Sequence, residues 1–291
     1  MSQTVARRRA LTGPLTGPLT GPQKALLAVG GVAAFVLIGW GVWTLVNLVG
    51  QTSYQRELTL AAPAGRLEVD LPGRITVEPG PGPGVRVVET VRYGTFRPKL
   101  SEVLTADVLA VRADCSWLTD NCAVDAVITV PASLSVDAVS SGGDITVHGL
   151  TGRVQLESSG GGIDASGLTG PVVLSSSGGE ITASRLTGPA ELDSSGGGVR
   201  ASDLGSREVT AHSSGGSVQL AFDTPPDRVI ADSSGGGVEV GLPRVDGGYQ
   251  VHADSSGGQT QTDVQTDPAS PRLIDAHSSG GDVRITTASP G

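Results

Sequence analysis

Aromatic side chains are scarce in this chain of 291 residues, which contains three Phe, three Tyr and three Trp. A core built around large aromatic anchors is therefore excluded, and small and β-branched side chains must fill the interior instead. Lysine is also rare, with two residues against 18 Arg, and Cys occurs only twice. Glycine is abundant, with 43 residues. This composition favours a fold that stacks thin, regular layers over one that surrounds a bulky core.

Positive charge is scarce in the second half of the chain. Residues 131–291 contain eight Arg and 19 Asp or Glu, whereas residues 1–50 contain four bases and no acid. An acidic surface repels the phosphate backbone, so nucleic acid is excluded as a partner of the C-terminal region. The simplest interpretation of the acidic excess is a solvated anionic surface, which also attracts divalent cations.

The N-terminal 50 residues divide into a polar tail and one long apolar run. Residues 1–23 contain three Leu-Thr-Gly-Pro repeats, and the repeated proline excludes a continuous helix, so a disordered cytoplasmic tail is expected. The run from Ala25 to Gly50 carries no charge and is long enough to cross a bilayer as a helix. Residues 24–50 are therefore predicted to be a transmembrane helix.

The charges around this run predict its orientation. All four bases of the region precede it, so the positive-inside rule places the N-terminus in the cytoplasm. A cleaved signal peptide is the alternative, but the run is too long for one and no convincing small-x-small cleavage site follows it. The sequence thus predicts a single-pass protein of the cell membrane whose C-terminal domain is extracellular.

Residues 51–130 alternate in polarity with a period of two, in short runs bounded by Pro and Gly. This is the pattern of β-strands, and we expect a membrane-proximal β region that forms the N-terminal cap of the domain behind it. Cys115 and Cys122 flank a short loop that contains Trp117. In an oxidising compartment these two Cys are expected to form a disulfide, and they are a poor metal site without further ligands. Trp117 either binds a partner or packs onto the sheet, and packing is favoured.

One tetrapeptide, Ser-Ser-Gly-Gly, recurs through residues 131–291. Its copies are 18 to 23 residues apart, a spacing typical of a solenoid in which each repeat is one coil. Two and four residues before each motif, and two and four residues after it, the positions are mostly small or aliphatic, so each coil is expected to have two short strands with alternate residues inside. The first Ser of each motif then points inward as a structural turn residue rather than a nucleophile. These residues are Ser140, Ser158, Ser176, Ser194, Ser213, Ser233, Ser255 and Ser278.

The alternating strands, the repeated Ser-Ser-Gly-Gly-x-Ile/Val turns and the single predicted membrane helix together resemble the DUF4097 family of bacterial adhesin-like proteins. The resemblance covers roughly residues 57–287. It implies an extracytoplasmic β-solenoid linked to surface adhesion or to envelope-stress systems, and it offers no catalytic residues. The expected fold is all-β, a solenoid of about eight coils behind one transmembrane α-helix.

Chemistry is expected only among the residues that point outward from the coils. The residue before each Ser pair is acidic or His in the later coils, so stacked coils should bring these side chains into one file that is able to bind zinc or another divalent ion. The simpler interpretation is an exposed file in which Asp and His relieve like-charge repulsion. Otherwise no cofactor is expected. The candidate ligands are Asp193, His212, Asp232, His252, Asp254, Asp275 and His277.

An enzyme is not expected from this sequence. Between residues 131 and 291 only Phe222 and Tyr249 are aromatic, so platforms for sugar stacking are nearly absent, and no acid–base pair stands out. Calcium-binding nonapeptides are absent as a motif. Two functions remain: an adhesin-like surface module that binds a cell-wall polymer, or an envelope-stress sensor or accessory subunit that acts through an envelope protein partner.

Overall fold

The computed structural model describes residues 37, 38, 40, 41, 52–61, 65–94, 96–115 and 122–287. The chain divides into two units, Met1–Gly50 and Gln51–Gly291. In the first unit, Leu37, Ile38, Trp40 and Gly41 are helical. Among the described residues, no helix has the length and apolarity needed to cross a bilayer. The rest of the predicted transmembrane helix over 24–50, and the tail over 1–23, lie outside the described residues, so both stay predictions.

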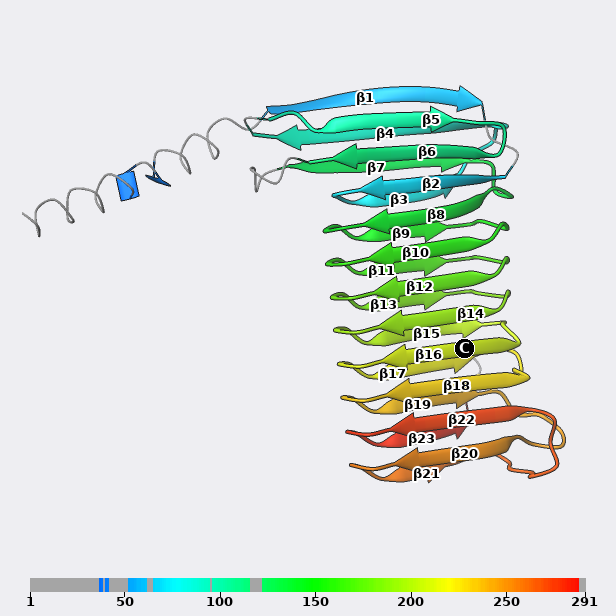
Figure 1. The fold of residues 1–291 in the computed structure, drawn as a ribbon. Helices are drawn as coiled ribbons and strands as arrows, with labels where there is room; N and C mark the ends of the chain where they lie inside the picture. The colour runs from blue at the N-terminus through cyan, green and yellow to red at the C-terminus, as the bar shows by residue number, and fades with distance from the viewer. Residues whose placement is uncertain are drawn as a thin grey trace, which may run out of the picture. The chain divides into compact units, whose positions relative to one another are not determined.

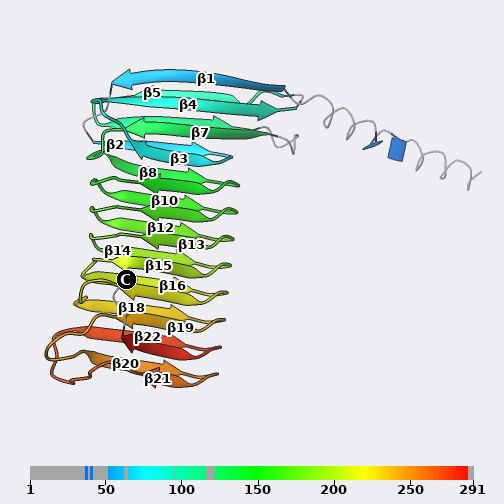
Figure 2. The same cartoon turned by 180° about the vertical axis from the view of Figure 1, so that it is seen from behind.

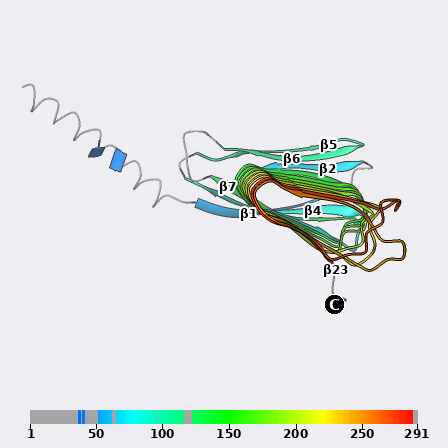
Figure 3. The same cartoon turned by 90° about the horizontal axis from the view of Figure 1, so that it is seen from below.

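The second unit is all-β and consists of two facing sheets of 12 and 11 strands. Figures 1 and 2 show the strands stacked as a regular ladder, and Figure 3 shows the same stack from its end. We call this stack the rod. At about 4.8 Å per strand it is about 50 Å long. The predicted β-solenoid is confirmed for this unit.

Eight parallel coils make up most of the rod, and each contains one strand of each sheet joined by a Ser-Ser-Gly-Gly turn. The inward residues of the two strands pack against each other, as Val154 and Leu156 of one strand and Ile163 and Ala165 of the next show by being at most 2% exposed. The strands are β8 (Ser135–Ser140), β9 (Ile145–His148), β10 (Val154–Ser158), β11 (Ile163–Ser166), β12 (Val172–Ser176), β13 (Ile181–Ser184), β14 (Ala190–Ser194), β15 (Val199–Leu204), β16 (Glu208–Ser213), β17 (Val218–Phe222), β18 (Arg228–Ser233), β19 (Val238–Leu242), β20 (Gln250–Ser255), β21 (Thr260–Thr262), β22 (Leu273–Ser278) and β23 (Val283–Thr287).

The first seven strands extend the rod and close it at one end. Two pairs of them, β2 with β3 and β6 with β7, are further parallel coils, whereas β1, β4 and β5 pair antiparallel. The outermost strands are β1 in the larger sheet and β5 in the smaller one, and we call this the proximal end. The bounds are β1 (Thr52–Ala61), β2 (Arg66–Leu71), β3 (Ile75–Pro79), β4 (Gly84–Tyr93), β5 (Lys99–Leu104), β6 (Val108–Asp114) and β7 (Ala123–Val130).

At the opposite, distal end the spatial order of the coils departs from the order of the chain. Strand β18 pairs with β22, and β22 in turn pairs with β20. The larger sheet follows the same order, β19, β23 and then β21. The coil of β22 and β23, which comes last in the sequence, is therefore inserted between its two predecessors. We call it the inserted coil, and we call the coil of β20 and β21 the terminal coil (Figure 1).

The inward side chains of these two coils explain their order. The inserted coil places Val283 and Ile285 inside, both 0% exposed. The terminal coil has Thr260 and Thr262 at the matching positions, and both are exposed. Burial of an aliphatic side chain stabilises the fold by about 1.5–3 kcal/mol, whereas a buried hydroxyl without a partner costs free energy. The apolar coil therefore belongs inside the rod and the threonine coil at its end.

Candidate functional site

The eight Ser-Ser-Gly-Gly turns stack along one side of the rod, and their first Ser residues form a column that is mostly buried. The first Ser of seven of them is at most 2% exposed. In each interior coil its hydroxyl donates to a glycine carbonyl of the neighbouring coil and accepts from a glycine N–H of its own turn. For Ser194 these bonds are 3.0 Å to Gly179 O and 3.1 Å from Gly197 N. The hydroxyls thus bond to the turn backbone, and their burial leaves them no access to a substrate.

The second glycine of each turn is required by close packing between coils. A Cβ on Gly236 would lie 2.6 Å from Ser217 N, and one on Gly161 would lie 2.6 Å from Asp144 N. None of the glycines in these turns has a left-handed φ. The left-handed positions lie instead at the opposite corner, for example at Gly149 with φ 69° and Arg185 with φ 53°. The second Gly therefore serves close approach rather than an unusual backbone conformation.

On the outer face of the smaller sheet, the structure brings five of the predicted ligands into one file. Cα register links Asp193 to His212, His212 to Asp232, Asp232 to His277, and His277 to Asp254. We call these residues the Asp/His file. The inserted coil makes the alternation of acid and imidazole complete, because it places His277 between Asp232 and Asp254. In sequence order these two carboxylates would be neighbours.

A second, shorter file runs beside the first, since His252 and Asp275 are register partners. Within the Asp/His file, His277 Nδ1 lies 3.4 Å from Asp254 Oδ2, a distance at which a protonated imidazole forms an ion pair. His212 Nε2 instead contacts Ser214 Oγ at 3.4 Å. Within the part of the chain that the structure describes, no three His, Cys, Asp or Glu side chains gather closely enough to hold a metal ion. Metal binding by the file stays a prediction.

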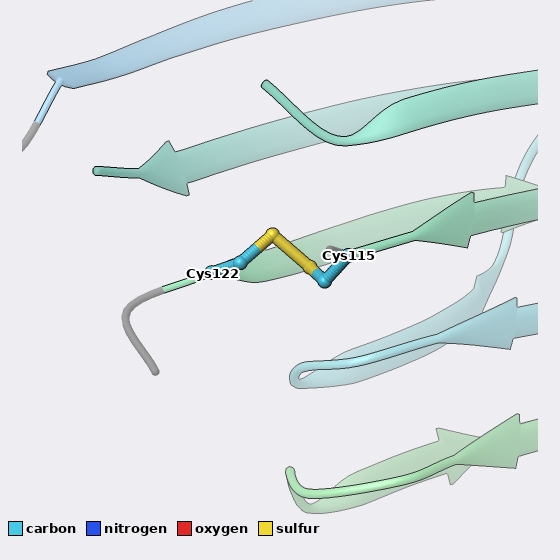
Figure 4. The surroundings of a disulfide bond; sticks show 2 residues. All are labelled: Cys115 and Cys122. Atoms are coloured by element: carbon cyan, nitrogen blue, oxygen red, sulfur yellow. A yellow bond between two sulfur atoms is a disulfide. The ribbon is translucent and has the colours of Figure 1, made fainter. Parts of the chain in front are cut away.

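Cys115 and Cys122 are joined by a disulfide that links the ends of β6 and β7 (Figure 4). In every later coil a Ser-Ser-Gly-Gly turn connects the two sheets, and here the disulfide-closed loop takes that place. Trp117 lies outside the described residues. The disulfide therefore belongs to the architecture of the proximal end.

The proximal end also holds a buried charge cluster that the sequence analysis missed. Glu89 of β4 is 0% exposed, and neither of its carboxylate oxygens has a hydrogen-bond partner. Burial raises the pKa of Glu89, the nearby Glu102 raises it further, and Arg56 opposes this shift. Arg56 Nη2 lies 2.7 Å from Glu102 Oε1, so this ion pair joins edge strands β1 and β5. The alternation of β4 could have revealed this burial from the sequence. Glu89 occupies an inward position of the strand, as Val87 and Val91 do.

The distal end has no comparable cluster among its described residues. Val251 and Ala253 of β20 are only partly buried, and Thr260 and Thr262 of β21 are exposed. These four residues line a hollow of about 450 Å³ that opens between the two edge strands. Tyr249, 1% exposed, forms one wall and donates a 2.8 Å hydrogen bond to Pro243 O. The open end of the rod is thus a shallow, mixed polar and apolar surface.

Comparison with known proteins yields similarity to solved structures alone. No family model matches the chain, and no curated protein matches it. A putative cell adhesion protein from Clostridium sporogenes matches with 8% identity and a TM-score of 0.28, over 81% of this chain and 100% of its own. A putative adhesin from Bacteroides fragilis matches with 15% identity and a TM-score of 0.39, over 81% of this chain and 97% of its own. At these identities and TM-scores neither match carries an argument about activity, and membership of the DUF4097 family stays a prediction.

Proposed function

We propose that this protein is a membrane-anchored, extracytoplasmic binding module that acts through the outer surface of its rod, as an adhesin-like surface protein. The observation that carries the proposal is the register of the outward side chains. The file of Asp193, His212 and Asp232 alternates carboxylate and imidazole from coil to coil, at intervals of about 4.8 Å. A periodic flat surface suits an extended or repeating partner better than a single small molecule, which needs a concave pocket.

A non-enzymatic role is part of this proposal. The hydroxyl of the first Ser in each turn is engaged by the turn backbone, as Ser194 and Ser213 illustrate. The outward acids are spaced as a file rather than converging on one point. An envelope protein partner, as in a sensor or accessory subunit, is the alternative partner class for the same surface.

The charge of the rod defines the chemistry of its partner. The smaller sheet presents Asp193, Asp232, Asp254 and Asp275 outward, with imidazoles between them. An anionic polymer is repelled by such a surface. We therefore propose that the bound cell-wall polymer is neutral or carries amino groups that pair with the carboxylates.

A binding assay with purified cell walls and with amino-bearing polysaccharide tests the proposal. The full chain in detergent micelles is compared with a double variant of the file, Asp193→Asn with Asp232→Asn. The matched control, Asp164→Asn with Glu239→Gln, removes two acids from the outer face of the larger sheet. We expect about a tenfold loss of affinity in the file variant and no loss in the control. Equal binding by both variants, or no binding by the wild type, overturns the proposal.

A further inference from the structure

The terminal coil leaves one edge of each sheet without a neighbour. Among the described residues, strand β20 pairs only with β22 and β21 only with β23, so both stand last in the order of their sheets. Just before β20, Tyr249 forms a bridge with Thr266, which covers the start of this edge. The N–H groups of Gln250 and Ser256 bond to the inserted coil and its approach segment. Because peptide groups alternate in direction along a strand, those of Val251, Ala253 and Ser255 face away from the rod.

These edges lack several of the devices that usually keep sheets from joining, although β21 is short, with three residues, and the segment 265–267 covers the start of β20. Natural edge strands carry Pro, Lys or an inward-pointing charge. Strand β20 has the sequence Gln-Val-His-Ala-Asp-Ser and β21 has Thr-Gln-Thr, so neither contains Pro or Lys, and their inward residues are uncharged. The proximal edge strands do carry inward charges, Arg56 in β1 and Glu102 in β5. The distal edges are therefore open to another pair of strands.

We propose that the distal end is a self-complementary interface through which two copies of this chain join end to end. A two-fold axis perpendicular to the sheets would place β20 antiparallel to β20 of the second copy and β21 antiparallel to its counterpart. Each sheet would then continue from one rod into the next, and the two hollows would face each other. An interface of this kind is isologous, since each copy contributes the same strands.

Hydrogen bonding and charge agree on one register for this pairing. A hydrogen-bonded antiparallel pair needs residues whose peptide groups face the partner, and Ala253 opposite itself meets that condition. His252 then lies opposite Asp254 of the second copy, twice by symmetry, as a non-hydrogen-bonded pair with close side chains. Imidazole and carboxylate are complementary there, and a shift of two residues along either strand loses both pairs. This complementarity favours a second copy as the occupant.

The arrangement has a consequence that rests on the proposed function. The chain enters the rod at Thr52 in β1, at the proximal end, and the terminal coil lies at the other end (Figure 1). If the proximal end is anchored to a membrane, distal pairing joins two membranes in trans. The adhesive partner would then be a second copy of this chain on a neighbouring cell.

Sedimentation of the full chain in detergent micelles tests the self-association directly. We expect a monomer–dimer equilibrium at roughly micromolar concentrations. Thr262→Lys places a charge at an inward edge position and should weaken the dimer at least about tenfold. Gln219→Lys is the matched control, because it adds the same charge on an outward position of interior strand β17. A monomeric wild type, or a dimer that Thr262→Lys leaves intact, overturns the proposal.

A charge exchange tests the register. Asp254→Lys puts a cation opposite His252 of the second copy and should weaken the dimer about tenfold. Adding His252→Asp restores a pair of opposite charges across the interface, so the double variant should recover dimerisation. Recovery supports the register centred on Ala253, and failure to recover contradicts it. Circular dichroism of each variant confirms that the β-structure is retained.

Vesicle clustering separates this inference from the proposed function. Vesicles of neutral phosphatidylcholine that carry the full chain should aggregate, and those that carry Thr262→Lys should not. Dimers in micelles without vesicle clustering would retain the interface and refute the adhesive role in trans. Clustering that Thr262→Lys does not reduce would contradict the distal interface itself.

Discussion

The two ends of the rod differ in how their outermost layers are covered. Any stack of coils ends in a layer whose inward face lacks a neighbour. At the proximal end, antiparallel strands β4 and β5 cover the last parallel coil, and β1 pairs with β4 in turn. Arg56 of β1 and Glu102 of β5 then meet between the sheets. At the distal end, the terminal coil remains parallel and presents Thr260 and Thr262. The proximal end thus places a charged pair between its edge strands, whereas the inward side chains of the distal edge strands are uncharged.

From this difference we infer that polarity sorts the coils. If inward polarity selects the terminal position, then an inserted coil as polar as the terminal coil should reduce the stability of the protein more than any other change considered below. Val283→Thr with Ile285→Thr buries two hydroxyls in place of aliphatic groups that are 0% exposed. We expect a loss of about 4 kcal/mol, visible as a lower thermal midpoint by circular dichroism in micelles.

The reciprocal change at the terminal coil is the matched control. Thr260→Val with Thr262→Ile gives β21 the inward residues of β23 at positions that are already exposed. Stability should change by less than about 1 kcal/mol, because little surface is buried there. Solubility should fall instead, since the open end becomes apolar. Equal destabilisation by both double variants would contradict sorting by polarity.

Removal of the ion pair at the proximal end should cause the second largest loss of stability. Arg56→Ala leaves Glu102 and the buried Glu89 without their countercharge. Because Arg56 is partly exposed, we expect a loss of about 2 kcal/mol at neutral pH, below that of a fully buried pair. The thermal midpoint should fall by a few degrees, and Arg284→Ala, which removes an exposed pair with Asp282, should hardly change it. No difference between the two variants would show that the ion pair does not close this end.

Glu89 should make the stability of the proximal end depend on pH. Its folded pKa is raised above the ordinary value of 4.5, so the folded state binds more protons than the unfolded state. Stability therefore falls as pH rises from the unfolded pKa through the folded one. Glu89→Gln should raise stability by about 1 kcal/mol at pH 8 and have no effect near pH 4.

Thermal midpoints across this pH range measure the effect of Glu89→Gln. Glu239→Gln on the exposed face of β19 is the control, and its midpoint should follow that of the wild type at every pH. A benefit of Glu89→Gln that persists at pH 4 would mean that packing, not charge, causes it.

Much of the rod could be predicted from the sequence because its turns and its parity repeat. The Ser-Ser-Gly-Gly spacing identified each coil, and alternation placed Ser194 inside and Asp193 outside, as the structure has them. The Asp/His file followed from the same parity. These features depend on local geometry that every coil repeats. Once the inward and outward positions of one coil are assigned, those of the other coils follow.

The order of the coils could not be predicted in the same way. All eight turns are alike, so the turn signature allows a coil to stack beside any other, and only side-chain polarity distinguishes the positions. The polar residues Thr260 and Thr262 distinguish the terminal coil from the others. The structure shows why this matters, because it places Ile285 of β23 between the terminal coil and β19. The antiparallel pairing of β1 with β4 likewise depends on distant partners rather than on local pattern.

The smallest expected change in stability is the difference between a residue inside the Asp/His file and the residue at its end. Asp232 lies between His212 and His277, whereas Asp254 has one neighbour in the file and is 79% exposed at its side chain. Exposed pairs contribute little, so Asp254→Asn should change stability by less than about 0.3 kcal/mol and Asp232→Asn by about 0.5 kcal/mol. Thermal midpoints at low ionic strength, and again in high salt, measure both changes. Salt should erase the difference because it screens exposed charges, and a difference that survives salt would show that Asp232 stabilises the rod through packing rather than through its two imidazole neighbours.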